Sequence, residues 1–132
     1  MKKIILVSGA GNSGKTTSIK LFLNNIGMFH LRDGDITVIF NLTVDGRQVA
    51  VGVASGGDTE KVVRENLKFF ESHSCEYIVC ASKSRGKTIE LVTEFAKKHD
   101  LHLCEIKTNL KSKKAAHLDN VRVAAEIEKC IT

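Results

Sequence analysis

The chain has 132 residues, of which 42% are hydrophobic, and this suits one domain spanning 1–132 with an ordinary buried core. Lysine and arginine number 20 against 15 acidic residues, so the formal charge is +5 and anionic partners are favoured over cationic ones. No run of five basic residues occurs, and aromatic residues do not alternate with basic ones, which disfavours a dedicated nucleic-acid surface.

The chain opens with a predicted strand at about 3–8, followed by a predicted helix at about 15–26. The apolar run before Ser8 is too short for a signal peptide or a membrane span, so we expect a cytoplasmic protein that does not enter a membrane. Four dispersed cysteines without a CxxC pair are expected to be reduced thiols, mostly buried.

The connection between this strand and helix reads SGAGNSGKTTS over residues 8–18. Glycine permits the backbone to curl so that its N–H groups surround a polyphosphate at a helix N-terminus. Lys15 can then reach the β and γ phosphates, and the Thr16 hydroxyl can bind Mg²⁺. The predicted phosphate-binding loop, with Thr17 and Ser18 near the α phosphate, comprises Gly9, Ala10, Gly11, Asn12, Ser13, Gly14, Lys15 and Thr16.

The spacing G-x-x-x-x-G-K-T between a strand and a helix resembles the Walker A motif of the P-loop NTPase superfamily, and the resemblance covers residues 4–18. It implies binding of ATP or GTP together with Mg²⁺. It also implies a second acidic group, at the end of another strand, that holds the magnesium through water. No more specific family is indicated by these residues.

The second and third predicted strands, at about 36–44 and 48–55, are joined by Asp45-Gly46-Arg47. Two strand-like runs separated by Asp-Gly predict an antiparallel hairpin. Further along, we expect helices at about 59–71, 87–98 and 118–130 and strands at about 76–82 and 101–106. This alternation predicts an α/β fold of three layers, with helices on both faces of a mostly parallel five-stranded sheet.

In such sheets, ligands bind outside the carboxyl ends of the parallel strands. We call this side the carboxyl edge, and it should gather residues 9–16, 55–58, 82–88 and 108–114. The best-placed second carboxylate there is Asp58, either as a magnesium anchor or as the N-cap of the following helix. It departs from the superfamily pattern, whose acid directly ends the strand, at the positions that hold Ala54 and Ser55 here.

Basic residues crowd two loops of the carboxyl edge, and Arg85 can contact a transferring phosphate or an acidic acceptor. Its neighbours are Lys83 and Lys87, and the loop after the last strand holds Lys111, Lys113 and Lys114. Solvated surface charge is the ordinary interpretation of such residues. Asp33 and Asp35 are candidates for positioning water or an acceptor, although Asp-Gly-Asp before a strand also fits a simple turn.

The predicted site therefore assigns Lys15, Asp58 and Arg85 to catalysis and Thr16 with Asp58 to Mg²⁺. Gly56 and Gly57 are similar to the loop that approaches the γ phosphate in Ras-like GTPases. The guanine-specifying N-K-x-D is missing after the fourth strand, where the chain reads ASKSR, so ATP is favoured over GTP. We expect an ATPase or a kinase acting on a small acidic or hydroxyl acceptor.

Two alternatives remain open at the level of sequence. The compact chain also suits a nucleotide-responsive module with little turnover that reports the bound nucleotide to a protein partner. If the protein is an enzyme, a second subunit of a homo-oligomer can supply the catalytic arginine. A nucleic-acid accessory factor is the least favoured class.

Overall fold

The computed structural model describes residues 2–11, 14–28, 34–109 and 113–131, the side chains of 113–115 excepted. Strands and helices alternate as the sequence predicts. Along the chain they are β1 (Lys3–Ser8), α1 (Lys15–Asn25), β2 (Thr37–Val44), β3 (Arg47–Ala54), α2 (Glu60–Ser72), β4 (Tyr77–Ser82), α3 (Lys87–Lys98), β5 (His102–Lys107) and α4 (Lys113–Ile131).

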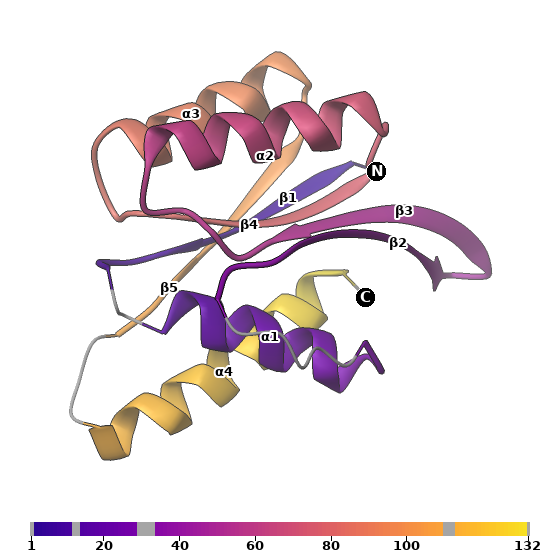
Figure 1. The fold of residues 1–132 in the computed structure, drawn as a ribbon. Helices are drawn as coiled ribbons and strands as arrows, with labels where there is room; N and C mark the ends of the chain where they lie inside the picture. The colour runs from indigo at the N-terminus through magenta and orange to yellow at the C-terminus, as the bar shows by residue number, and fades with distance from the viewer. Residues whose placement is uncertain (1, 12–13, 29–33, 110–112, 132) are drawn as a thin grey trace.

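The five strands form one sheet in the order β2-β3-β4-β1-β5, and only the β2–β3 pair is antiparallel. Helices α2 and α3 cover one face of this sheet, and α1 and α4 cover the other (Figure 1). The prediction of a mostly parallel α/β sheet with an antiparallel hairpin is thereby confirmed. Strand β1 is central, paired with β4 on one side and β5 on the other.

The hairpin turn follows from its two residues. Asp45 and Gly46 have φ values of 51° and 76°, the left-handed values that a two-residue hairpin turn requires. Beyond the turn the register pairs Leu42 with Val49 and Phe40 with Val51, so apolar side chains meet on one face.

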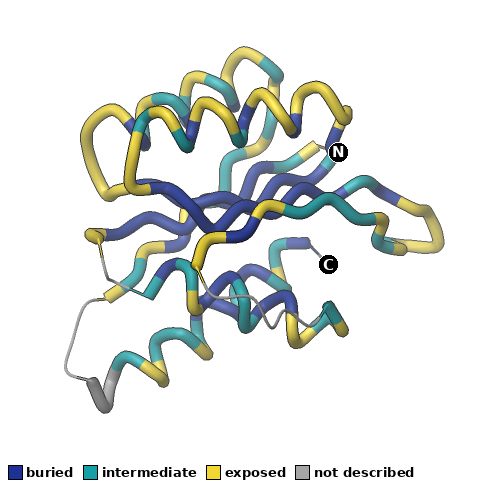
Figure 2. Tube along the Cα trace, viewed as in Figure 1, coloured by how far each residue is buried: buried dark blue, intermediate teal, exposed yellow. Residues whose placement is uncertain are grey.

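The core lies on both faces of the sheet, and β1, β4 and the second half of β3 are its most deeply buried strands (Figure 2). Because side chains alternate along a strand, Ile5 and Val7 of β1 face the layer of α1 and α4. Ile4 and Leu6 belong to the second cluster, with α2 and α3. None of the helices within the described residues is both long and apolar enough to cross a membrane.

The start of the last helix was predicted wrongly. We expected it near residue 118, with Leu118, Asp119 and Asn120 as its start signal, but α4 begins at Lys113. Asp119 lies inside the helix, where it accepts hydrogen bonds from Arg122 and from the backbone N–H of Asn109. The hydrogen bond to Asp119 raises the pKa of Arg122 above its usual value. Asp119 thus fastens the end of β5 to α4.

Candidate functional site

The carboxyl edge brings together the ends of strands that are distant in the sequence. The backbone N–H of Gly9 donates to the carbonyl of Ser82 at 3.1 Å, joining the ends of β1 and β4. Thr108 N–H donates to the Ser8 carbonyl at 2.9 Å, joining the ends of β5 and β1. These bonds bring together three of the four predicted segments, and the fourth, 55–58, contacts Lys15 and Thr16 at the start of α1.

Gly14 sets the entry into α1. As the N-cap residue it has φ 89° and ψ 14°, a left-handed conformation that glycine adopts without strain. A Cβ there would lie 2.5 Å from Oδ1 of Asn120, so α4 packs against this point of the loop. Gly14 has no side chain to cap the helix, which leaves first-turn N–H groups available to an anion.

The rest of the predicted loop divides into buried and exposed parts. Gly9 is buried, whereas Ala10 and Gly11 are exposed. A Cβ built at Gly11 meets nothing within 4 Å, so the predicted need for glycine there depends on the approach of a phosphate. Asn12 and Ser13 lie outside the described residues.

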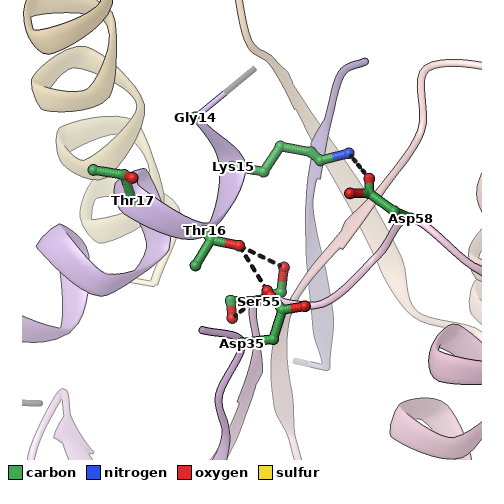
Figure 3. A pocket seen from close by; sticks show the side chains of 7 residues that line it. All are labelled: Gly14, Lys15, Thr16, Thr17, Asp35, Ser55 and Asp58. Atoms are coloured by element: carbon green, nitrogen blue, oxygen red, sulfur yellow. Dashed lines mark hydrogen bonds and ion pairs between the residues drawn. The ribbon is translucent and has the colours of Figure 1, made fainter. Parts of the chain in front are cut away.

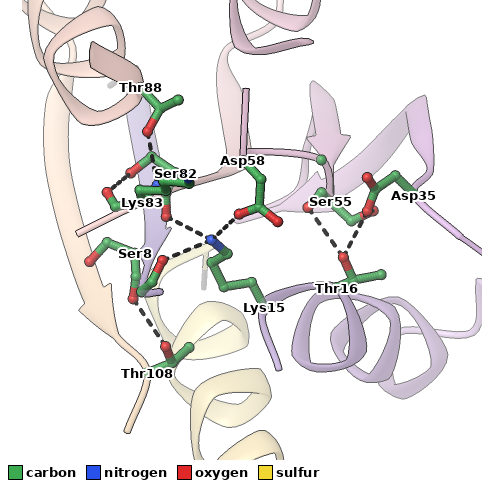
Figure 4. A network of polar contacts seen from close by, with 12 residues as sticks. Ser8, Lys15, Thr16, Asp35, Ser55, Asp58, Ser82, Lys83, Thr88 and Thr108 are labelled. Atoms are coloured by element: carbon green, nitrogen blue, oxygen red, sulfur yellow. Dashed lines mark hydrogen bonds and ion pairs between the residues drawn. The ribbon is translucent and has the colours of Figure 1, made fainter. Parts of the chain in front are cut away.

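Lys15 lies at the centre of the carboxyl edge with only 5% of its surface exposed. Its ammonium donates to the carbonyl of Gly9 at 2.8 Å and to that of Ser82 at 3.2 Å. The third contact is an ion pair with Oδ1 of Asp58 at 2.6 Å (Figure 4). The lysine therefore links α1 to the ends of β1 and β4 and to the loop after β3.

Thr16 makes a different set of contacts. Its hydroxyl donates to Oδ1 of Asp35 at 2.8 Å and lies 3.4 Å from the carbonyl oxygen of Ser55 (Figure 3). The hydroxyl of Ser55 accepts from the N–H of Ile36 at 2.8 Å, which fixes the chain next to Asp35. The carboxylate beside Thr16 thus comes from the segment before β2.

Asp58 pairs with Lys15 and has 53% of its side chain exposed. The alternative prediction that it caps the next helix is wrong, because the N-cap of α2 is Thr59, whose hydroxyl accepts from Val62 N–H. No hydrogen bond between Thr16 and Asp58 occurs among the described contacts. Its predicted part in binding Mg²⁺ stays a prediction.

These side chains line a cavity of about 400 Å³. Its lining is Gly14, Lys15, Thr16, Thr17, Asp35, Ser55 and Asp58. A cation, three hydroxyls and two carboxylates in one hollow fit a magnesium polyphosphate, because Mg²⁺ takes oxygen ligands and keeps several of them from water and phosphate. Within the described residues no three acidic, histidine or cysteine side chains cluster as a metal site, so water and phosphate oxygens would complete the coordination.

The remaining predicted residues lie away from this cavity or outside the described residues. Arg85 is exposed on the loop between β4 and α3 and does not line the cavity. Its neighbours Lys83 and Lys87 are also exposed, and Lys87 forms an ion pair with Glu90. Asp33 and Lys111 fall outside the described residues, and of Lys113 and Lys114 only the backbone is described.

Two contributors were missed by the sequence reasoning. Ser55 was noted only as an occupant of the position that usually holds an acid, yet its carbonyl and hydroxyl lie beside Thr16 and Asp35. Asn120 accepts a hydrogen bond from the Ser18 hydroxyl at 3.0 Å and borders Gly14. The position of Ser55 at a strand end was a usable signal, whereas the contact of Asn120 depends on how α4 packs against α1.

Comparison with known proteins leaves the site to be interpreted on its geometry. No protein-family model matches the chain, and no curated protein matches it.

Proposed function

We propose that the chain is a Mg²⁺-dependent nucleotide-binding P-loop protein that prefers ATP to GTP and acts on the γ phosphate, as an ATPase or a kinase of a small acceptor. The observation that carries the proposal is the pair Lys15 and Thr16 on the first turn of α1, facing a cavity at the carboxyl ends of parallel strands. Helix N-termini at such strand ends are established phosphate-binding positions.

The donors divide into a phosphate side and a metal side. Lys15 would neutralise phosphate charge, together with the backbone N–H groups of the loop. Thr16 and Asp35, whose oxygens lie 2.8 Å apart, would hold Mg²⁺, which when bound neutralises the charge of the polyphosphate. We assign the metal-side carboxylate to Asp35 because it directly contacts Thr16, whereas Asp58 contacts Lys15.

Phosphoryl transfer further needs a group that orients the attacking oxygen and one that stabilises the transferred phosphate. Ser55 lines the cavity beside Asp35 and presents a hydroxyl. Arg85 stays our candidate for stabilising the transferred phosphate, since it lies three residues after Ser82, whose carbonyl accepts a hydrogen bond from Lys15. For that role the Arg85 loop would have to move toward the cavity when the acceptor binds.

Binding is tested by thermal unfolding with ATP, ADP, GTP and GDP, each with Mg²⁺ and with EDTA. A ligand at a hundred times its dissociation constant adds about 2.7 kcal/mol to the free energy of unfolding, a shift of several degrees in a chain of this size. We expect the largest shift with Mg-ATP and none in Lys15→Ala. Lys97→Ala, an exposed lysine in the last turn of α3, is the matched control and should behave as the wild type.

A shift of equal size in Lys15→Ala would place the nucleotide elsewhere. Thr16→Ala and Asp35→Asn should keep ATP binding in EDTA but lose the additional stabilisation by Mg²⁺. Release of phosphate, with and without small acceptors, then separates an enzyme from the nucleotide-responsive module. Binding without turnover would favour the latter.

A further inference from the structure

All three N–H donors of the Lys15 ammonium group form hydrogen bonds within the chain. A lysine side chain carries three N–H donors, and here three oxygens of the chain accept from it: Gly9 O, Ser82 O and Asp58 Oδ1. The lysine is nearly buried, so the chain itself satisfies its charge. A phosphate that binds Lys15 must therefore replace one of these acceptors.

The three acceptors differ in how easily they can leave. The carbonyls of Gly9 and Ser82 belong to the backbone, and the Ser82 carbonyl also accepts from Gly9 N–H at 3.1 Å, which ties both to the sheet. The Asp58 carboxylate is half exposed and needs only side-chain rotation to leave. It is also the acceptor that resembles a phosphate oxygen in charge.

The loop that carries Asp58 is held in place from behind. A Cβ at Gly57 would overlap the carbonyl of Ala81 and lie 2.7 Å from Ser82 N, so the backbone of Gly57 packs directly on the end of β4. On its other side, Thr59 caps α2. The loop therefore presents the carboxylate to Lys15 from a fixed position.

From this geometry we propose that Asp58 is an internal competitor for the phosphate position on Lys15. In the protein without ligand its carboxylate occupies the lysine, and a bound polyphosphate displaces it. The proposal rests on the proposed function and gives the two carboxylates of the cavity separate roles. Asp35 supports the metal side, and Asp58 lowers the affinity for phosphate.

The test is titration calorimetry of Asp58→Asn with inorganic pyrophosphate in EDTA, with ATP in EDTA, and with ATP and Mg²⁺. Asparagine keeps the shape of the side chain and removes the charge. We expect binding about three- to tenfold tighter in EDTA, because the variant loses both an ion pair that must be broken and the repulsion between like charges. Asp58→Ser serves as the second variant if the first does not fold.

Glu60→Gln is the matched control. It removes one negative charge two residues after Asp58, and the Glu60 side chain pairs with Arg64 and not with Lys15. It should bind as the wild type does. Unchanged or weaker pyrophosphate binding in folded Asp58→Asn or Asp58→Ser would overturn the proposal while leaving nucleotide binding intact. Weakening confined to Mg-ATP would instead make Asp58 a metal ligand. If no phosphate compound binds wild type or variant, the proposed function fails and the competitor role fails with it.

Discussion

Cys80 is a thiol enclosed between the sheet and the layer of α2 and α3. It lies in β4 with 4% of its surface exposed, beside Ile4 and Leu6 of the same cluster. Burial disfavours the thiolate and raises the pKa of Cys80 from 9.0 to about 12. The thiol therefore stays protonated in the folded protein across the physiological range.

This shift predicts a loss of stability at alkaline pH. Below pH 9 the folded and unfolded states both keep the proton, and above it the unfolded chain loses the proton first. The free energy of unfolding should fall by up to about 1.4 kcal/mol per pH unit between pH 9 and 12. Urea denaturation between pH 7 and 10.5 measures this fall in the free energy of unfolding. In Cys80→Ala the free energy should fall less steeply with pH. An identical decline in both proteins would show that other groups cause it.

At the scale of single residues, the spacing of the glycine-lysine motif predicted some residues of the candidate site and left others undecided. The eight-residue motif identified Lys15 and Thr16, because helix geometry fixes where consecutive residues of a first turn lie. Sequence could not decide which carboxylate contacts which partner. Asp35 and Asp58 lie in different loops, and only the packing of β2 and β3 against α1 brings one to Thr16 and the other to Lys15.

Helix α2 depends on a cap that can be removed by a single substitution. Thr59 has extended backbone angles, and its hydroxyl accepts from Val62 N–H at 3.3 Å. Replacing a capping threonine by alanine typically costs about 1 kcal/mol. Thr59→Ala should lower the free energy of unfolding by about that amount in urea denaturation. Thr59→Ser should keep most of the wild-type value, and equal losses in both variants would argue against the hydroxyl as the cause.

Helix boundaries were predicted well where the local sequence decides them and poorly where tertiary contacts do. The prediction for α3, 87–98, agrees with the structure. For α4 the aspartate at 119 looked like a cap, but its carboxylate is used by Arg122 and by the backbone of Asn109. Capping residues in a helix interior can be recognised only when such partners are known, which explains the five-residue error.

On the scale of the whole molecule, the layer of α2 lies so close to the sheet that one strand position must lack a side chain. A Cβ at Gly52 of β3 would overlap the ring of Phe70, which is fully buried. Overpacking a core typically costs 1–3 kcal/mol. Gly52→Ala should therefore lower the free energy of unfolding, measured by urea denaturation, by about 1–3 kcal/mol. Adding Phe70→Leu should recover part of the loss, and two strictly additive losses would contradict the steric explanation.

The sheet itself was the most predictable feature of the molecule. Apolar runs such as Ile4–Val7 are typical of strands buried on both faces, and Asp45-Gly46 indicated the antiparallel β2–β3 pair. The order of the strands was not predicted, because the sequence does not specify that β5 returns to the far side of β1. That choice depends on how α3, which connects β4 to β5, crosses the sheet.

The central position of β1 has a consequence for motions of the native protein. Its neighbours β4 and β5 bond to both of its edges, and Ile4, Leu6 and Val7 are wholly enclosed. Separating β1 from the sheet would require breaking both ladders, so partial opening should begin at peripheral elements such as the β2–β3 hairpin. Gly9, which directly follows β1, is thus anchored to the part of the molecule that opens last, and fraying of the periphery would leave its anchorage intact.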